Sequence, residues 1–291
     1  MAIACSMKYI FPAHLIASLC IPLASAEDLK NSFDMTMVDI KSGEFTMGSP
    51  ASEKSRGRDE DQAKAKISSD FWISSTEVTQ GQWAAVTGMT LDKLIETKIG
   101  ALGRGAKLKN YPSAVGDKQP MCFVNYADVL GFCEKLTKLE KDAGKLPEGY
   151  EYTLPTEAQW EYAARSGTST TFAFGNSLDG TQACFYGPKP YNSEVKVEYK
   201  EKTENVASFK PNAWGLYDMH GNVYEWCLDW YVDKIPGGED PVTLKDGDSR
   251  SIRGGAWNRP ATSSRSSYRY SYDPTQRTNN IGFRVVLVKQ K

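Results

Sequence analysis

The chain has 291 residues, with 35 Lys and Arg residues against 36 Asp and Glu residues. That length allows one large domain or two small ones, and a net charge of -1 gives no overall attraction to nucleic acid, so nucleic-acid binding is not expected. Seven Trp and fifteen Tyr residues are too many aromatic residues for a disordered chain. We therefore expect a folded globular protein.

Residues 1–26 have the layout of a secretory signal peptide. Lys8 is their only charged residue, the apolar run IFPAHLIASLCIPL follows it, and the small residues Ala-Ser-Ala at 24–26 precede Glu27. We predict cleavage after residue 26 and export of the protein to the periplasm or the extracellular space.

Two alternatives to a cleaved signal peptide are weaker. A membrane anchor needs a long uninterrupted apolar run, whereas Pro12, His14 and Pro22 interrupt this one, so no transmembrane segment is expected after cleavage. A lipoprotein would be modified at Cys20, but Leu19 is bulkier than the small residue that normally precedes a lipidated cysteine. Lipidation therefore stays an alternative only.

Few histidines and cysteines follow residue 26. His220 is the single histidine, so sites built from several histidines are excluded, and without a G-x-S-x-G motif a serine triad is not expected. No two cysteines form a C-x-x-C pair, which disfavours zinc ribbons and thioredoxin-like chemistry. In an exported protein the remaining cysteines permit up to two disulfide bonds, and they are equally compatible with buried thiols: Cys122, Cys133, Cys184 and Cys227.

Three short helices are expected from their start signals. Each begins with a residue whose side chain can cap the first turn: Thr79, Asn125 and Thr156. Gly88 is expected to stop the first helix, and Gly167 can take the left-handed position at the end of the third. In the second helix apolar residues recur at helical spacing, so Cys133 is expected in the core rather than as a reactive thiol.

The other regular elements are expected to be short strands joined by turns. Residues 43–49 and 280–288 have strand-like sequences, and the segment SSYRYSYD alternates strictly, which places Tyr268, Tyr270 and Tyr272 on one face. We expect this tyrosine face to pack on the core. Few, short helices and strands among many turns indicate a loop-rich α+β fold.

Two long polar segments are expected to be loops. Residues 98–120 are rich in glycine and basic residues, but the glycines do not follow a strand in a G-x-G-x-x-G arrangement, so no nucleotide site is predicted. Residues 191–204 are expected to form a loop or hairpin with its charges on the outer face.

Motifs along the chain resemble, in the same order, those of the formylglycine-generating-enzyme family, also called the sulfatase-modifying-factor domain. The resemblance predicts one such domain at 35–291. It implies an α+β fold, an elaborated relative of the C-type lectin-like fold, with few short helices and strands. The motifs are SGEFTMGSP (42–50), STEVTQGQW (75–83), FVNYADVLGFC (123–133), LPTEAQWEYAARSG (154–167), NAWGLYDMHGNVYEWCLDWY (212–231), IRGGAWN (252–258) and NIGFRVV (280–286).

The resemblance also implies where copper would bind. Family members oxidise a sulfatase cysteine to formylglycine with Cu(I) and O2, and a cysteine pair just after an R-G-G-S-W segment holds the metal. Here the segment is RGGAWNRPATSSR, and the cysteine positions are held by Arg259 and Ser264. A guanidinium does not deprotonate to bind metal and a serine oxygen is a hard ligand, whereas Cu(I) prefers thiolates. Copper is therefore not expected, and no catalytic residue is assigned.

A Ca2+ ion in the loop before the W-E-W motif is a further implication of the resemblance. Matched residue by residue, Asp218 and Glu225 supply the side-chain ligands, and Gly221 and Val223 supply backbone carbonyls. Carboxylates and carbonyls are hard oxygen ligands of the kind that Ca2+ takes. The family's other calcium site is not carried over, because Cys184 stands where the family has an Asn.

Three functions are compatible with these residues, and the sequence leaves open whether the protein is an enzyme. The first is an accessory or recognition protein that keeps the fold without copper oxidation and binds a protein, peptide or glycan. The second is a divergent oxidase acting on a peptide or siderophore-type substrate, as one periplasmic siderophore-maturation branch of the family implies. The third is a lectin-like carbohydrate or cell-envelope binding module. The candidate pocket of the oxidase comprises Trp257, Asn258, Arg259, Ser264 and Tyr268.

Overall fold

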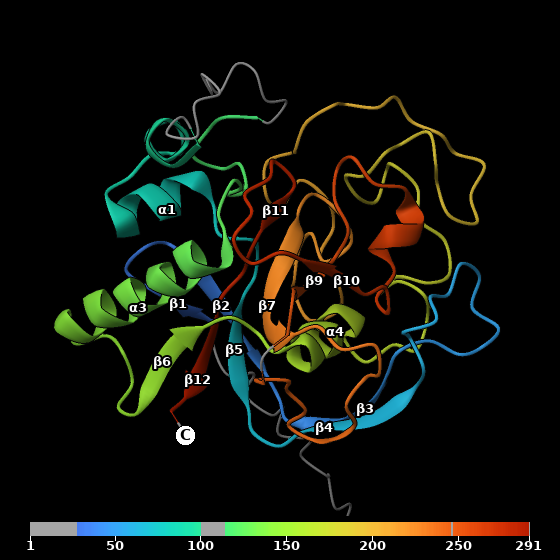
Figure 1. The fold of residues 1–291 in the computed structure, drawn as a ribbon, viewed down its shortest axis with the longest axis horizontal. Helices are drawn as coiled ribbons and strands as arrows, with labels where there is room; N and C mark the ends of the chain where they lie inside the picture. Colours follow the sequence, from blue (N-terminus) through green and yellow to red (C-terminus); the bar gives the residue numbers. More distant parts are fainter. Residues whose placement is uncertain (1–27, 100–113, 246, 291) are drawn as a thin grey trace, which may run out of the picture.

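The computed structural model describes residues 28–99, 114–245 and 247–290 (Figure 1). The signal peptide expected at 1–26 lies outside these residues, as does most of the loop expected at 98–120. The described chain combines short strands, a few helices and long irregular segments, which confirms the loop-rich α+β fold. None of its helices has both the length and the apolar composition that a membrane crossing needs.

The largest sheet joins strands from early and late parts of the sequence. Its order is β1-β2-β5-β12-β6, and all neighbours are antiparallel. Strand β12 is interior, so Val286 lies opposite Ile73 on one side and opposite Thr153 on the other. The strands are β1 (Leu29–Lys30), β2 (Thr36–Ile40), β5 (Phe71–Ser74), β12 (Val286–Lys289) and β6 (Tyr150–Thr153).

Two smaller sheets complete the strand arrangement. The second sheet has the order β10-β9-β7-β11 and lies near the middle of the view in Figure 1, whereas the third has the order β3-β4-β8. The strands of the second are β10 (Tyr270–Tyr272), β9 (Arg250–Arg253), β7 (Tyr224–Trp230) and β11 (Ile281–Gly282). Those of the third are β3 (Gly43–Met47), β4 (Ala63–Ile67) and β8 (Gly238–Glu239).

Local capping determines where the main helices begin. Thr79, Asn125 and Thr156 each form a capping box with the residue three positions later, as expected. Gly88 ends its helix in the left-handed conformation, but Ser166 takes this role in the third helix, one residue before Gly167. The helices are α1 (Gln80–Thr87), α2 (Leu91–Leu94) with a π-helical turn (Ile95–Ile99), α3 (Tyr126–Asp142), α4 (Glu157–Arg165) and a 3-10 turn (Ala261–Ser264).

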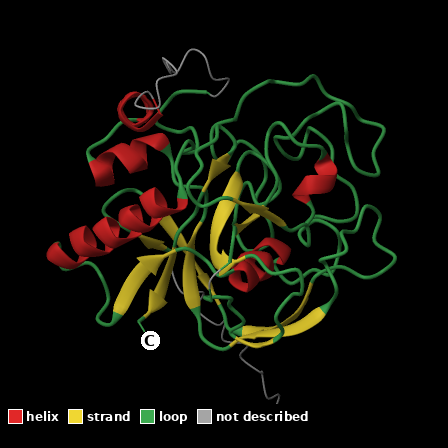
Figure 2. Ribbon diagram, viewed as in Figure 1, coloured by secondary structure: helices red, strands yellow, loops and turns green. Residues whose placement is uncertain are grey.

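Aromatic residues fill the core between α1, α3 and the strands. Figure 2 shows α1 and α3 together on one side of the strands, while irregular segments occupy much of the other side. Trp83 of α1 stacks on Phe132 of α3 with 5.5 Å between ring centroids, and Phe283 meets both rings edge-on. Trp160 and Trp226, which lie within the most specific motifs, have 0% exposed surface. These rings therefore contribute to the packed interior and not to a binding surface.

The strand expected at 280–288 is divided into β11 and β12. Between them Arg284 turns inward to the carboxylate of Glu225, and the Val285 carbonyl accepts from the Ser74 N–H at 2.8 Å. A buried charge needs a partner, and the pairing of Arg284 with Glu225 therefore interrupts the regular strand at this point.

The alternating segment 266–273 is buried on both faces to different degrees. Tyr268 and Tyr272 pack against the edge of the core, but Tyr270 is 39% exposed. Arg269, on the opposite face, is nearly fully buried. The expectation of a core-packed tyrosine face is therefore only partly met, because the arginine between the tyrosines finds a buried carboxylate and takes the interior position.

Buried arginines paired with glutamates recur through the core. Five of them have 5% or less exposed surface: Arg165, Arg253, Arg265, Arg269 and Arg284. Arg269 donates from Nε and Nη2 to both oxygens of Glu157 at 2.8 and 2.9 Å. Burial alone would raise the pKa of Glu157, but Arg269 holds it below its usual value. This bidentate pair connects α4 with the residue before β10, and Arg253 of β9 donates to Glu161 of the same helix.

His220 joins the loop before β7 to two other segments. Its Nδ1 lies 2.8 Å from the Ser264 carbonyl, and its Nε2 accepts from the Ala173 N–H at 3.0 Å, which places the ring proton on Nδ1. The rings of Phe172 and Phe174 meet the imidazole edge-on. Burial lowers the pKa of His220 to about 4. The ring is therefore neutral, and both nitrogens are already engaged in structural contacts.

The pair Arg269–Glu157 provides a test of how much the buried charges matter. Replacing Arg269 by Met should destabilise the fold by about 3–5 kcal/mol, because Glu157 is left as a buried charge without its partner. The double change Arg269→Met with Glu157→Leu should recover most of this loss. Urea denaturation measures both effects, with the exposed pair Lys138–Asp142 as control: Lys138→Met should leave the midpoint unchanged. Equal destabilisation by the single and the double change would contradict the interpretation.

Candidate functional site

The two positions that correspond to the copper cysteines face different surroundings. Arg259 is exposed to solvent. Ser264 has no exposed surface and ends a 3-10 turn, and a Cβ placed on Gly255 would come within 2.4 Å of its Oγ. That Oγ has no hydrogen-bond partner among the described residues. The two side chains are therefore not presented together at one accessible surface.

Trp257 is covered by the segment 191–204. The ring is 3% exposed and stacks on Tyr199 with 5.8 Å between centroids and 12° between planes. Val197 of the same segment lies where a side chain on Gly180 would be, since a Cβ there would come within 1.9 Å of a Val197 methyl. The charged residues of the segment are exposed, as expected, except Glu204, which is half-buried, while Tyr199 and Val197 close this part of the candidate pocket.

Tyr268 belongs to a row of three stacked rings, Tyr224, Tyr268 and Tyr270, which we call the tyrosine row. The centroids of Tyr268 and Tyr270 are 6.4 Å apart, and those of Tyr270 and Tyr224 are 5.8 Å apart. Burial raises the pKa of Tyr224, whose hydroxyl bonds to Ser263, and the charge of Arg259 acts on the same hydroxyl. Strict alternation in the sequence indicated Tyr268 and Tyr270, but Tyr224 joins them from another strand and was missed.

Asn258 completes the set of predicted pocket residues. It is half-buried, and its side-chain oxygen accepts from Asn280 at 3.0 Å. Trp257 lines a small cavity of about 10 Å³ to which none of the other four predicted residues contributes. The five residues therefore occupy one region of the chain without converging on a single cavity.

The four cysteines are buried and form no disulfide bond within the described residues. Burial raises the pKa of Cys184 to about 12, and it also raises that of Cys133 and Cys227. Cys133 packs in the core as expected. Thiols with raised pKa values stay protonated near neutral pH, so these three do not supply thiolates for metal or substrate.

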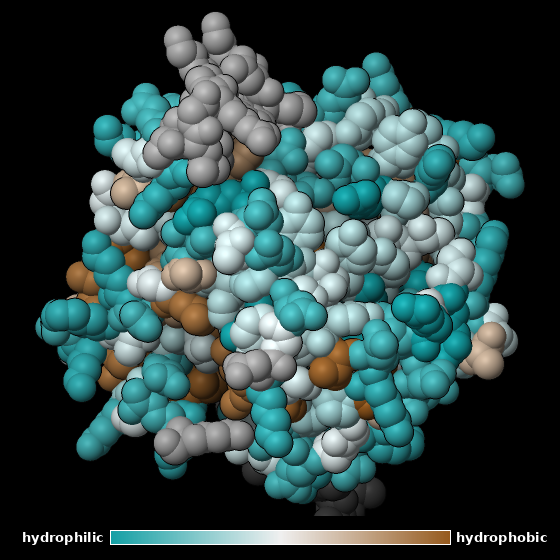
Figure 3. All heavy atoms as spheres, viewed as in Figure 1, coloured by the Kyte–Doolittle hydropathy of each residue, from teal (hydrophilic) through white to brown (hydrophobic). Residues whose placement is uncertain are grey.

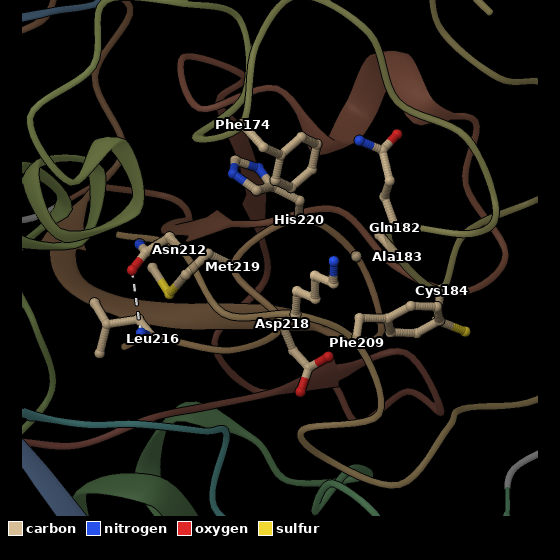
Figure 4. A pocket seen from close by; sticks show the side chains of 12 residues that line it. Phe174, Gln182, Ala183, Cys184, Phe209, Asn212, Leu216, Asp218, Met219 and His220 are labelled. Carbon is tan, nitrogen blue, oxygen red and sulfur yellow. Dashed lines mark hydrogen bonds between the residues drawn. The ribbon is translucent and has the colours of Figure 1, made fainter. Parts of the chain in front are cut away.

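Asp218 begins the loop expected to bind Ca2+. It adopts a left-handed backbone conformation with φ of 57°, and its Oδ2 accepts from the Ala207 N–H at 2.7 Å. Figure 4 shows its carboxylate pointing away from Phe174 and His220, which line the same small cavity. Burial raises the pKa of Asp218 to about 6. Asp218 is half-buried, and its carboxylate lies on the side away from those rings.

Backbone geometry fixes the middle of this loop. Gly221 has a φ of 129°, and a Cβ there would come within 2.3 Å of the Cys184 carbonyl, so the position requires glycine. Val223, the other expected carbonyl ligand, is fully buried just before β7. Close packing against the backbone of Cys184 therefore determines the path of the loop between Asp218 and Glu225.

Glu225 is already saturated with donors. Arg284 donates to its Oε1 and Oε2 at 2.9 and 2.7 Å, and the Trp160 indole N–H donates to Oε2 at 2.7 Å. A calcium ligand needs lone pairs directed at the ion, but a guanidinium and an indole occupy this carboxylate. The set of Asp218, Gly221, Val223 and Glu225 therefore does not fit Ca2+ at Glu225 in this arrangement.

Glu77, which the sequence did not indicate, lies beside Asp218. It is 0% exposed; its Oε1 accepts from Asn222 Nδ2 at 3.1 Å, and its Oε2 has no hydrogen-bond partner within the described residues. Burial raises the pKa of Glu77 well above its usual value, and the charges of Asp218 and Glu225 add to this. Within the described ranges no three His, Cys, Asp or Glu side chains are grouped for a metal.

Similar proteins share both the fold and much of the sequence. The solved structure of PvdO from Pseudomonas aeruginosa superposes with a TM-score of 0.68 at 29% identity, over 89% of this chain and 96% of that one. The formylglycine-generating enzyme of Streptomyces coelicolor is 36% identical over 147 residues, which are 45% of each chain. The serine/threonine-protein kinase pkn1 of Chlamydia pneumoniae is 29% identical over 262 residues, or 85% of this chain, which spans only 37% of the kinase.

The family assignment rests on nearly the whole sequence. Residues 25–289 match the model of the sulfatase-modifying factor enzyme 1-like domain, and this range includes all three sheets and all of the described helices. The chain belongs to the sulfatase-modifying factor enzyme 1-like domain family.

Proposed function

We propose that this chain is a recognition domain that binds a partner and does not carry out copper-dependent oxidation. The observation that carries the proposal is the identity of residues 259 and 264, where Arg and Ser replace the thiolates that Cu(I) requires. The domain by itself does not fix an activity, since relatives that carry it have names as different as a protein kinase and a formylglycine-generating enzyme.

Tyr268 and Tyr270 of the tyrosine row form the proposed binding surface together with Arg259, while Tyr224 supports them from the interior. Tyrosine rings combine a large apolar area with a polar hydroxyl, and an exposed arginine supplies several hydrogen-bond donors. Both residue types are enriched where proteins bind partners. Figure 3 shows a face dominated by hydrophilic residues, with the hydrophobic residues in small separate areas. A partner that binds to a few tyrosine rings and one arginine is accordingly a protein, peptide or glycan rather than an apolar molecule.

Binding to peptide and glycan arrays tests this surface. The wild-type protein should retain a probe, and Tyr270→Ala should weaken its binding at least about tenfold, because the most exposed ring of the row is lost. Leu244→Ala removes an exposed apolar side chain outside the row and should leave binding unchanged. Unchanged binding by Tyr270→Ala would place the surface elsewhere. Formylglycine formed from a C-x-P-x-R peptide with Cu(I) and O2 would favour the oxidase instead.

Export is part of the proposed function, because the layout of residues 1–26 supports a cleaved signal peptide. The recognition surface would then face the periplasm or the cell exterior. Mass spectrometry of the protein isolated from its native cells should find Glu27 at the N-terminus. A lipid-modified Cys20 or a retained Met1 would contradict cleavage after residue 26.

We also propose that one Ca2+ binds at Asp218, in the loop that the family resemblance indicates, without Glu225 as a ligand. The support is an excess of buried negative charge, since the carboxylates of Glu77, Asp218 and Glu225 interact with the single guanidinium of Arg284. A chelator should therefore lower the melting temperature and added Ca2+ should restore it, because a ligand at 100 times its Kd stabilises by about 2.7 kcal/mol. Absence of calcium in elemental analysis, with no effect of chelation, would contradict this proposal.

A further inference from the structure

We infer that Glu77 and Asp218, not Asp218 and Glu225, supply the carboxylates that bind the cation. The inference rests on the proposed Ca2+ and changes its ligands. It brings in a residue from the segment after β5 that is 141 positions before Asp218 in the sequence and that the family resemblance does not assign.

The first step is that Glu225 is already paired with a positively charged side chain, that of Arg284. Its two oxygens accept three hydrogen bonds, of which Arg284 supplies two in a bidentate arrangement. Arg284 is itself fixed, since it also donates to the carbonyls of Ser74 and Tyr217 at 2.9 and 2.8 Å. A Ca2+ ion at Glu225 would have to displace a fully buried guanidinium and leave its positive charge beside the ion, which is unfavourable.

The second step is that Glu77 has no such partner. Glu60, Glu157 and Glu161 are likewise buried, and each accepts from an arginine within 3.0 Å. Among the described residues, no arginine or lysine donates a hydrogen bond to Glu77, whose Oε1 accepts from the Asn222 amide. Oε2 is left without a donor at a fully buried position. An ionised carboxylate is seldom buried without a compensating charge, so this oxygen indicates a bound cation.

The third step is the position of Asp218. Its carboxyl group lies within hydrogen-bonding reach of Glu77, and one of its oxygens is held by the Ala207 N–H. Two acceptor-only groups repel each other at this separation unless a positive species lies between them. With Glu225 neutralised by Arg284, the remaining two carboxylates match the double charge of Ca2+.

An open cleft borders this pair. Thr76 and Ala207 line a cleft of about 610 Å³, together with the side chains of Ser75 and Thr79. Thr76 directly precedes Glu77, and the Ala207 N–H donates to Asp218. The cleft therefore reaches the backbone next to each carboxylate, and water in the cleft can contribute to an oxygen shell there.

Calcium binding by variants of Glu77 tests the ligand assignment. Isothermal titration with CaCl2 in chelator-treated buffer should show one ion per wild-type chain, and Glu77→Gln should bind at least about tenfold more weakly. Glu77→Gln should be at least as stable as the wild type in EDTA, because the amide removes an uncompensated charge and can donate to Asp218. The matched control is Glu140→Gln, which alters another buried carboxylate, one that accepts from the Ser32 N–H, and should bind Ca2+ as the wild type does.

The outcomes separate this inference from the calcium proposal. If the wild-type protein binds no Ca2+, the calcium proposal and this inference are both wrong, and the two carboxyl groups share a proton. If the wild type binds Ca2+ and Glu77→Gln binds it equally well, only the assignment of Glu77 falls. Glu77→Asp keeps the charge but shortens the side chain, so it serves if Glu77→Gln does not fold. An affinity of Glu77→Asp equal to that of the wild type would likewise overturn the assignment.

Discussion

Pairing of buried arginines with buried glutamates is the constraint on which the rest of this structure depends. A domain with short strands and long irregular segments has few backbone ladders to fix the relative positions of its parts. Glu157 and Glu161 of α4 receive Arg269 and Arg253 from the second sheet and its neighbouring segment, so helix and sheet are joined by directional contacts. Burying such a pair costs free energy, because both charged groups lose their water. The hydrogen-bond geometry of each pair, however, allows only one arrangement of the helix and the sheet.

The sequence was sufficient where the determining interactions are local. Thr79, Asn125 and Thr156 act on the next three residues, and all three helix starts were predicted correctly. Burial of Arg269 was not predictable in this way, because its partner Glu157 lies 112 residues away and the choice of the inward face depends on it. The same distance effect explains why a strand expected to be continuous is broken at Arg284.

The candidate site shows a similar limit. Residue identity alone was enough to make copper binding at 259 and 264 implausible, because that argument needs only ligand chemistry. The resemblance also indicated the loop of Asp218 and Glu225, but it did not indicate which of the two carboxylates is already paired with another side chain. Whether a carboxylate is free or paired depends on residues far along the chain, and Glu77 could be noticed only once its burial and its missing donor were known.

The interior position of β12 has a consequence for how the chain reaches this structure. Val285, just before β12, donates its N–H to Ser74 Oγ, a residue 211 positions earlier, so the largest sheet closes a very long segment of chain. Until β12 has been synthesised, β5 and β6 present open edges with unpaired backbone groups. Contacts of such long range form slowly, and unpaired edges favour aggregation. A nascent chain of this protein therefore depends on being kept from self-association until its late strand is available.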